Sequence, residues 1–397
     1  MSSDRIAVVP AVVHWARQSA GLQSDLAAKR LGISETSLAS WESGELEPTI
    51  KQLRKAAKVY RRPLAVLLLP TPPEDFQPLK DFRKTASGDG DRPWSPALHA
   101  EFKRALSQRE VILELIEIAP GSTHQPDENV TIESSQDAEE AGRLLRAALR
   151  LDEEPPSWSN PNDALNTCVT AAERLGILVI QTHGVGMSEM HGFSISEWPC
   201  PVVALNGSDW PRRRVFTLLH ELTHIGLNAG GLCDLHDSGP NLRTTNDEFE
   251  HFCNRAAAAA LMPHDTFLAD GAVRTVSDAY EWTLNDLSQL SRRYGASSEA
   301  VLLRLVTVGK ATWDLYWRRR AELEAQYEQL RQQEKERRRD SEGGPSYYVV
   351  KARDLGHAYV ASVIDAYQIR AISSLDVADY LDVRYDQVPK LEAVLRS

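Results

Sequence analysis

The sequence predicts a multidomain, mainly α-helical protein with an all-α helix-turn-helix domain at its N-terminus and an α+β domain in its middle. The chain has 397 residues, which at roughly 100 to 200 residues per domain corresponds to two to four domains. Short amphipathic helical segments, broken by glycines and prolines, fill the first 70 residues. Three strand-like runs, ILVIQT, GFSIS and PVVALN, follow a helical segment between residues 163 and 206 and precede another helix.

Composition excludes several classes of protein. Hydrophobic residues make up 42% of the chain and charged residues 25%, which is close to the average for globular proteins. The longest apolar run, over residues 63–70, is far shorter than the roughly 18 to 20 residues that span a bilayer, so we expect no membrane partner. Because the first 20 residues lack a signal-peptide pattern, we expect a cytoplasmic location. The four cysteines form no CxxC pair, so reduced thiols are expected.

Charge is distributed unevenly along the chain. The net charge is −11, yet residues 1–70 contain ten Lys and Arg against six Asp and Glu, a net charge of +4 that leaves −15 for the remainder. Any contact with nucleic acid is therefore expected at the N-terminus.

The pattern of helices, strands and polar stretches divides the chain into five segments. These are a helix-turn-helix domain over 1–70, a linker with connecting helices over 71–162, the α+β domain over 163–310, a charged helix over 311–344 and a small helical unit over 345–397. The charged helix has too few apolar positions for a sustained heptad seam, so a solvated helix is favoured over a partner-binding coiled coil. The end of the last unit, over 376–395, is acidic, which favours dimerisation or packing over DNA reading and leaves a homodimer open.

The helix-turn-helix is the run AAKRL, GIS, ETSLASWESG. Gly32 permits the tight turn, Ile33 fills the angle between the helices and Ser34 can cap the second helix. The candidate DNA contacts on these two helices are Lys29, Arg30, Glu35, Thr36, Ser37 and Ser40. Cationic side chains suit phosphates, but an acid near the major groove repels the backbone unless it accepts from a cytosine amine. A helical interaction module without DNA readout is the alternative.

The sequence His220-Glu221-Leu222-Thr223-His224 is the most informative motif. Residues four apart differ by only 40° around a helix, so the two histidines project from one face and can hold one zinc ion. Glu221 lies at the edge of that face, where its carboxylate can accept a proton from a zinc-bound water and pass it to the leaving amine. The alternative is that both are core histidines. The motif predicts a zinc peptidase site with Zn²⁺ as the cofactor.

A catalytic zinc requires a third protein ligand, and Glu250, 26 residues after His224, is our candidate. Asn254 follows one turn later on the same helix face and can hydrogen-bond a ligating histidine. Four other residues compete with Glu250 for this role: Cys233, His236, Glu248 and His251. Glu248 lies half a turn from Glu250 and should face away from it.

Other polar residues near the motif have less certain roles. Arg212, Arg213 and Arg214 precede the predicted zinc helix and can bind a substrate carboxylate or stabilise an oxyanion, although a solvated basic patch is equally compatible. His183 and His191 can line the cleft, but loop histidines are usually only solvent-exposed. The loop over 230–246 lies between the candidate ligands and is rich in Gly, Asp and Asn, which suits a lid.

The run RRRVFTLLHELTHIGL, followed by Glu250-x-x-x-Asn254 and ALMP, resembles the ImmA/IrrE family of zinc metallopeptidases, and MHGFSISEWPCPVVALN resembles the segment that leads into its motif. Residues 11–70 resemble an XRE-type helix-turn-helix through LGIS, WESG and Pro48, and DFR at 81–83 resembles the joint of the fused architecture. The resemblance implies a gluzincin-like fold, zinc on His220, His224 and Glu250, and Glu221 as general base. It also implies a protein substrate, typically a transcriptional repressor whose cleavage induces stress-response or mobile-element genes.

Two functions are compatible with these features. The first is a cytoplasmic zinc endopeptidase that carries a DNA- or partner-binding head and cleaves a regulatory protein. The second is an XRE-type regulator or antitoxin-like protein whose zinc domain senses or scaffolds without proteolysis. A head that represses its own promoter while the peptidase acts elsewhere is a third possibility. The cleaved protein, the operator and the inducing signal leave no trace in the sequence.

Overall fold

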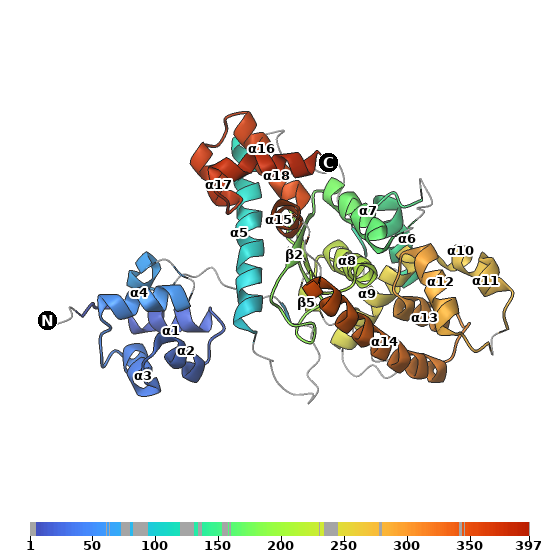
Figure 1. The fold of residues 1–397 in the computed structure, drawn as a ribbon, viewed down its shortest axis with the longest axis horizontal. Helices are drawn as coiled ribbons and strands as arrows, with labels where there is room; N and C mark the ends of the chain where they lie inside the picture. The colour runs from blue at the N-terminus through green and yellow to red at the C-terminus, as the bar shows by residue number, and fades with distance from the viewer. Residues whose placement is uncertain are drawn as a thin grey trace. The chain divides into compact units, whose positions relative to one another are not determined.

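The computed structural model contains two compact units (Figure 1), of which the first comprises residues 1–78 and 85–104 and the second residues 79–84 and 105–397. The structure describes residues 5–60, 62, 64–72, 80–81, 94–119, 131–133, 137–152, 158, 160–229, 231–233, 245–277, 280–340, 344 and 346–396. The predicted fold class is confirmed: an all-α helix-turn-helix unit is joined to a mainly helical part that contains one small mixed sheet. The finer division into five segments stays a prediction.

The first unit, the head, is built from short helices. These are α1 (Pro10–Gln18), α2 (Ser24–Leu31), α3 (Glu35–Ser43), α4 (Ile50–Val59) and the 3-10 helix η1 (Leu64–Leu68). Between α2 and α3, Gly32 has φ of 67°, a left-handed conformation that glycine adopts without steric cost. The Ser34 side chain accepts a hydrogen bond from the Ser37 amide and so caps α3. The predicted turn and cap are therefore both present.

An ion-pair cluster joins α1 to α3 inside the head. Arg17 donates to both carboxylate oxygens of Glu42, at 2.6 and 2.9 Å, and His14 Nδ1 lies 2.8 Å from the same carboxylate. A third Arg17 nitrogen donates to the Leu22 carbonyl. Trp41, next to Glu42, is 1% exposed in the core. The cluster fixes the second helix of the motif against the first helix of the unit.

The first part of α5 (Pro96–Ile118) completes the head core. Trp94, Leu98 and Phe102 are buried, and a Cβ atom added to Gly21 would lie 2.9 Å from the Trp94 carbonyl oxygen. Lys103 donates to the Ser19 carbonyl, at the C-terminal end of α1. A cation is favourable there because of the helix dipole.

The second unit contains a sheet of the strands β1 (Lys80–Asp81), β2 (Leu178–Thr182), β3 (Gly192–Ile195), β4 (Val202–Asn206) and β5 (Gly231–Cys233). Their order across the sheet is β1-β5-β3-β4-β2. Strand β3 is antiparallel to both β4 and β5, whereas β2 is parallel to β4 and β1 is parallel to β5. Strands β2, β3 and β4 match the predicted runs. The short strands β1 and β5 were not predicted because two or three residues carry no alternation.

Helices make up most of the other described residues of this unit. They include α6 (Ala138–Ala148), α7 (Pro161–Arg174), α8 (Pro211–Gly226), α9 (Thr245–Leu261), α10 (His264–Ala269), α11 (Gly271–Arg274), α12 (Leu284–Tyr294), α13 (Ser298–Thr307) and α14 (Trp313–Asp340). Helices α8 and α9 lie side by side (Figure 1). The Arg304 side chain, 1% exposed, pairs with both oxygens of Glu139 and donates to the Met262 carbonyl. This contact ties α13 to α6 and to the end of α9.

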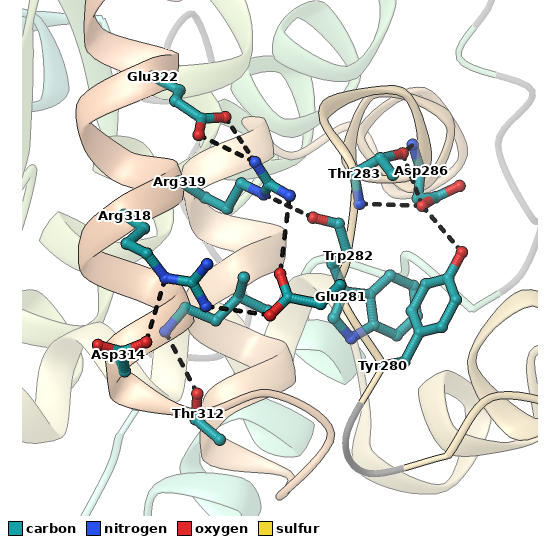
Figure 2. Close-up of polar contacts among 11 residues, drawn as sticks. Tyr280, Glu281, Trp282, Thr283, Asp286, Thr312, Asp314, Arg318, Arg319 and Glu322 are labelled. Atoms are coloured by element: carbon teal, nitrogen blue, oxygen red, sulfur yellow. Dashed lines mark hydrogen bonds and ion pairs between the residues drawn. The ribbon is translucent and has the colours of Figure 1, made fainter.

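The charged helix α14 packs against the same unit near its N-terminal end. Arg318 and Arg319 contact Glu281 and the Trp282 carbonyl, which lie in the segment before α12 (Figure 2). Leu323 is 3% exposed and belongs to the main core, and Tyr327 packs against it. These two apolar side chains are therefore used within the chain. Leu330, further along the helix, is 42% exposed.

The chain ends in a helical group of α15 (Tyr347–Leu355), α16 (His357–Gln368), α17 (Ser374–Tyr380), η2 (Tyr385–Gln387) and α18 (Val388–Leu395). Gly356, between α15 and α16, has φ of 91°, and a Cβ atom there would lie 2.7 Å from the Val179 carbonyl oxygen of β2. Gln108 of α5 donates to the Leu355 carbonyl. Close backbone approach thus places α15 beside β2. Among the helices described, none combines the length and apolarity needed to cross a membrane.

We predict that Glu42→Gln destabilises the head. Burial alone would raise the pKa of Glu42, but hydrogen bonds from Arg17 and His14 outweigh burial and hold the pKa below its ordinary value. The ionised carboxylate therefore contributes stability that is complete above the unfolded pKa of about 4.3 and is lost as the pH falls through the lowered folded pKa. We expect a loss of roughly 2 kcal/mol of unfolding free energy at neutral pH, shrinking toward about pH 3.

Scanning calorimetry of the full chain at both pH values measures this effect. The control is Glu45→Gln, which changes an exposed acid of the same segment and should leave the transition in place. A Glu42→Gln deficit that persists undiminished in acid would contradict the assignment of the effect to this ion pair.

Candidate metal centre

Helix α8 carries the HELTH motif through the middle of the domain. Proline occupies its first turn, where a missing amide proton costs little. From Arg214 to Gly226 every residue is buried. Such a helix is apolar on most faces, and its few polar side chains must find partners inside the protein. His220, Glu221 and His224 are each 0% exposed.

Three side-chain donors converge at this helix. Nε2 of His220 and Nε2 of His224 are 3.0 Å apart, and the two oxygens of Glu250 lie 3.2 Å from His220 Nε2 and 3.3 Å from His224 Nε2. Glu250 is on α9 and is 4% exposed. Burial alone would raise the pKa of Glu250, but its interactions with the two facing histidines lower it to about 2. Helix α9, which follows α8 in the chain, therefore supplies the predicted third donor through Glu250.

The three residues fit a zinc ion. Zinc binds nitrogen and oxygen donors at roughly 2.0–2.2 Å in tetrahedral geometry, which places the donors roughly 3.3 Å apart. The observed separations of 3.0 to 3.3 Å agree with that spacing. His224 Nδ1 lies 3.1 Å from the Ala229 carbonyl oxygen, so Nδ1 carries the proton and Nε2 presents its lone pair. Among the described residues, no other group of three or more such side chains gathers in this way.

Glu221 is held by strand β3 from the other side. Ser194 donates from Oγ to Glu221 Oε2 at 2.8 Å, and Ser194 is 0% exposed. A Cβ atom at Gly192 would lie 3.0 Å from Glu221 Oε1 and 2.6 Å from Thr217 Cγ2. Burial raises the pKa of the Glu221 carboxyl. The carboxylate is thus confined between a hydroxyl donor and a strand that approaches closely because it has glycine at that point.

The residues that competed with Glu250 do not join the cluster where the structure describes them. Glu248 is exposed and His251 is half-buried. His236 and the Cys233 side chain lie outside the described residues, as does most of the predicted lid. Asn254 is 3% exposed on α9. Within the described part of the chain its Oδ1 and His220 Nδ1 each lack a hydrogen-bond partner, so the expected link from Asn254 to a ligating histidine stays a prediction.

Two further histidines of the sequence analysis pair with acids. His191 is 4% exposed, and its Nδ1 lies 3.1 Å from Asp209 Oδ2. Burial alone would raise the pKa of Asp209, but the His191 hydrogen bond and the charge of Arg213 hold it below its ordinary value. His183 Nε2 lies 2.6 Å from Asp354 Oδ2 of α15. Neither histidine belongs to the cluster of three donors.

The residues predicted to contact DNA lie on the surface of the head. Lys29, Arg30, Glu35 and Thr36 are exposed, and Ser37 and Ser40 are half-buried. The hydroxyls of Thr36 and Ser37 both lie 2.8 Å from Ser34 Oγ at the start of α3. Two of the candidate DNA contacts, Thr36 and Ser37, therefore share a hydrogen-bond network with the residue that caps α3.

Sequence reasoning did not identify Ser194 or Gly192 as partners of Glu221. The run GFSIS predicted a strand, but no spacing rule links a strand residue to a helix residue 27 positions later. Their contact depends on which strand of the sheet lies under α8, which the sequence pattern leaves open.

Two family models match the chain. A peptidase family described as the IrrE N-terminal-like domain matches residues 172–306, and a helix-turn-helix family matches residues 13–67. The first match contains α8, α9 and strands β2 to β5, and the second contains most of α1 and all of α2 to α4. The predicted fusion of an XRE-type helix-turn-helix with an ImmA/IrrE-type domain is confirmed. No curated protein and no solved structure matches the chain.

We predict that Gly192→Ala destabilises the second unit by about 1–3 kcal/mol, because the added carbon must displace Thr217 or the Glu221 carboxylate in a packed core. The matched control is Gly271→Ala, where an added Cβ meets nothing within 4 Å. Thermal unfolding of both variants measures the difference. Equal melting temperatures would show that the strand can move away from α8, contrary to the packing described above.

Proposed function

We propose that this chain, with its IrrE N-terminal-like domain at residues 172–306, is a zinc-dependent endopeptidase whose head binds DNA. The observation that carries the proposal is the convergence of His220, His224 and Glu250 next to a buried second acid, Glu221. A site of this composition has a position left for water and a base beside it.

Each residue receives a role from its position. His220, His224 and Glu250 would hold the zinc ion, which when bound lowers the pKa of water and polarises a carbonyl group. Glu221 would accept the proton released by the attacking water and deliver it to the leaving amine. Ser194 would orient the Glu221 carboxylate through its hydrogen bond to Oε2. Asn254 would support the ligand shell from α9.

The substrate that we propose is a regulatory protein of the repressor type in the cytoplasm. The family resemblance supports this class, and a DNA-binding head on the same chain would bring the peptidase to the sites where such proteins act. Cleavage would then relieve repression of stress-response or mobile-element genes.

A regulator without proteolysis is the second candidate. The observation in its favour is the charge of the head, where a net +4 over residues 1–70 contrasts with the acidic remainder. In this case, the metal centre would sense or scaffold, and the exposed Lys29 and Arg30 would carry the function through DNA.

We predict that Glu221→Gln keeps about one zinc per chain but lowers cleavage at least about 100-fold, because general base catalysis is lost while the donors remain. The double change His220→Ala and His224→Ala should lose the zinc, and Glu250→Ala should weaken its binding. Elemental analysis measures the metal. Mapping of protein N-termini in cells that express each form identifies the cleaved protein.

The control for Glu250→Ala is Glu248→Ala, which removes an exposed acid two residues away and should retain zinc and activity. Cleavage that survives Glu221→Gln would remove Glu221 from the role of base. A protein that binds zinc but produces no new N-termini in any cell would favour the regulator.

We predict that changing both Lys29 and Arg30 to alanine weakens binding to duplex DNA about equally for all sequences and lowers the salt dependence by roughly two phosphate contacts. Duplexes selected from a random pool by the wild-type chain are the test ligands. Arg143→Ala and Arg331→Ala, which change exposed cations outside the head, should bind as the wild type does. If the wild-type chain selects no duplex, the head is an interaction module.

A further inference from the structure

A polar cluster that the proposed reaction does not use lies where β2 and β4 end. These two strands are parallel, so their carboxyl ends lie at one edge of the sheet, which is the edge where α/β proteins commonly bind ligands. Helix α8 begins a few residues after β4, and its N-cap residue, Trp210, makes no side-chain capping bond. An uncapped helix start of this length favours negative charge.

Arg214 is the second observation, and it is independent of the helix start. Its side chain leaves the first turns of α8 and donates to Gln181 Oε1, near the end of β2, at 2.7 Å. The residue is only 6% exposed, its Nε has no hydrogen-bond partner among the described residues, and no carboxylate of that part of the chain forms an ion pair with it. A buried guanidinium without an anion is costly. Burial and, to a lesser degree, the charge of the nearby Arg353 lower the pKa of Arg214 to about 10.

The acids nearest to Arg214 are occupied by other partners. Asp209 accepts from His191 and from the Trp210 amide, and it forms an ion pair with Arg213 at 3.7 Å. Asp354 accepts from His183 at 2.6 Å and from Arg353 at 2.9 and 3.1 Å. Each of these carboxylates thus already has its own cation, and one positive charge at Arg214 is left without a counterpart.

The same place has a residue without a side chain. Gly207 follows β4, and a Cβ atom there would lie 3.2 Å from His183 Cε1 and 3.6 Å from Gln181 Oε1. A side chain there would also crowd the Thr182 carbonyl oxygen at 3.0 Å, so the glycine lets the ends of β2 and β4 approach closely beside Gln181. Arg353, 39% exposed on the side chain, borders this position from α15.

We propose that Arg214, with Arg353, His183 and the Gln181 amide around it, forms a binding site for a small oxyanion, either a carboxylate or a phosphate. The anion completes the charge balance of Arg214 and bridges α8, which carries the HELTH motif, to α15 of the C-terminal helices. The C-terminal helices would then form one side of this binding site. The inference stands apart from the proposed peptidase, because it concerns binding and uses none of the three metal donors.

The test is calorimetric titration of the full chain with inorganic phosphate and, separately, with N-acetylglycine, whose amide N-acetylglycinamide lacks the charge. Ionic strength is held constant with chloride. We expect saturable binding of at least one anion with a Kd of about 1 mM, at least tenfold weaker binding in Arg214→Gln and at least threefold weaker binding in Arg353→Gln. Arg212→Gln, which changes a neighbour that donates to Ser291 instead, should bind as the wild type does.

Binding of phosphate alone assigns a phosphate ligand, and binding of N-acetylglycine alone assigns a carboxylate. Because both anions can also bind zinc, the titration is repeated with the His220→Ala and His224→Ala double variant, which should retain the binding. If Arg214→Gln fails to fold, the partly exposed Arg353 provides the deciding variant. The proposal is overturned if neither anion binds saturably, if Arg214→Gln or, in its place, Arg353→Gln binds as the wild type does, or if binding disappears with the histidines.

Discussion

The burial of α8 from Arg214 to Gly226 is the constraint on which the site depends. A helix that crosses the core with two imidazoles and a carboxylate needs partners for these groups, because an unpaired buried polar group costs several kcal/mol. The neighbouring elements supply much of this pairing: Glu250 faces both histidines from α9, Ser194 donates to Glu221 from β3, and the Ala229 carbonyl orients His224. The same contacts that make the motif tolerable in the core bring its functional groups to fixed positions.

Local patterns in the sequence predicted much of this arrangement. Gly32 and Ser34 marked the helix-turn-helix because a left-handed turn and a cap have residue preferences of their own. Helical periodicity predicted that the two histidines share one helix face. The need for a third zinc ligand directed the search to the next helix, which contains Glu250. These signals lie within one element or in the next helix along the chain.

Contacts between distant elements could not be predicted in the same way. The pairing of Arg304 with Glu139 joins residues 165 positions apart, and no periodicity connects them. The order of the strands, with β5 between β1 and β3, depends on backbone pairing of segments too short to alternate. Arg214 was one of three adjacent arginines in the sequence, and only its burial against Gln181 distinguishes it from the others.

The head does not end at a single position of the chain, because it comprises residues 1–78 and 85–104. Residues 79–84 leave the first unit to supply a strand to the sheet, and the chain returns to build residues 85–104 into the head before it leaves again. Trp94, Leu98 and Phe102 are part of what the head buries. A fragment that stopped at residue 70 would therefore lose a wall of its core and expose the end of α1, whereas a fragment reaching residue 104 would carry the strand segment with it. The chain thus crosses between the two units three times, at 78/79, at 84/85 and, inside α5, at 104/105, so a protease that cuts at one crossing would leave the other two as tethers.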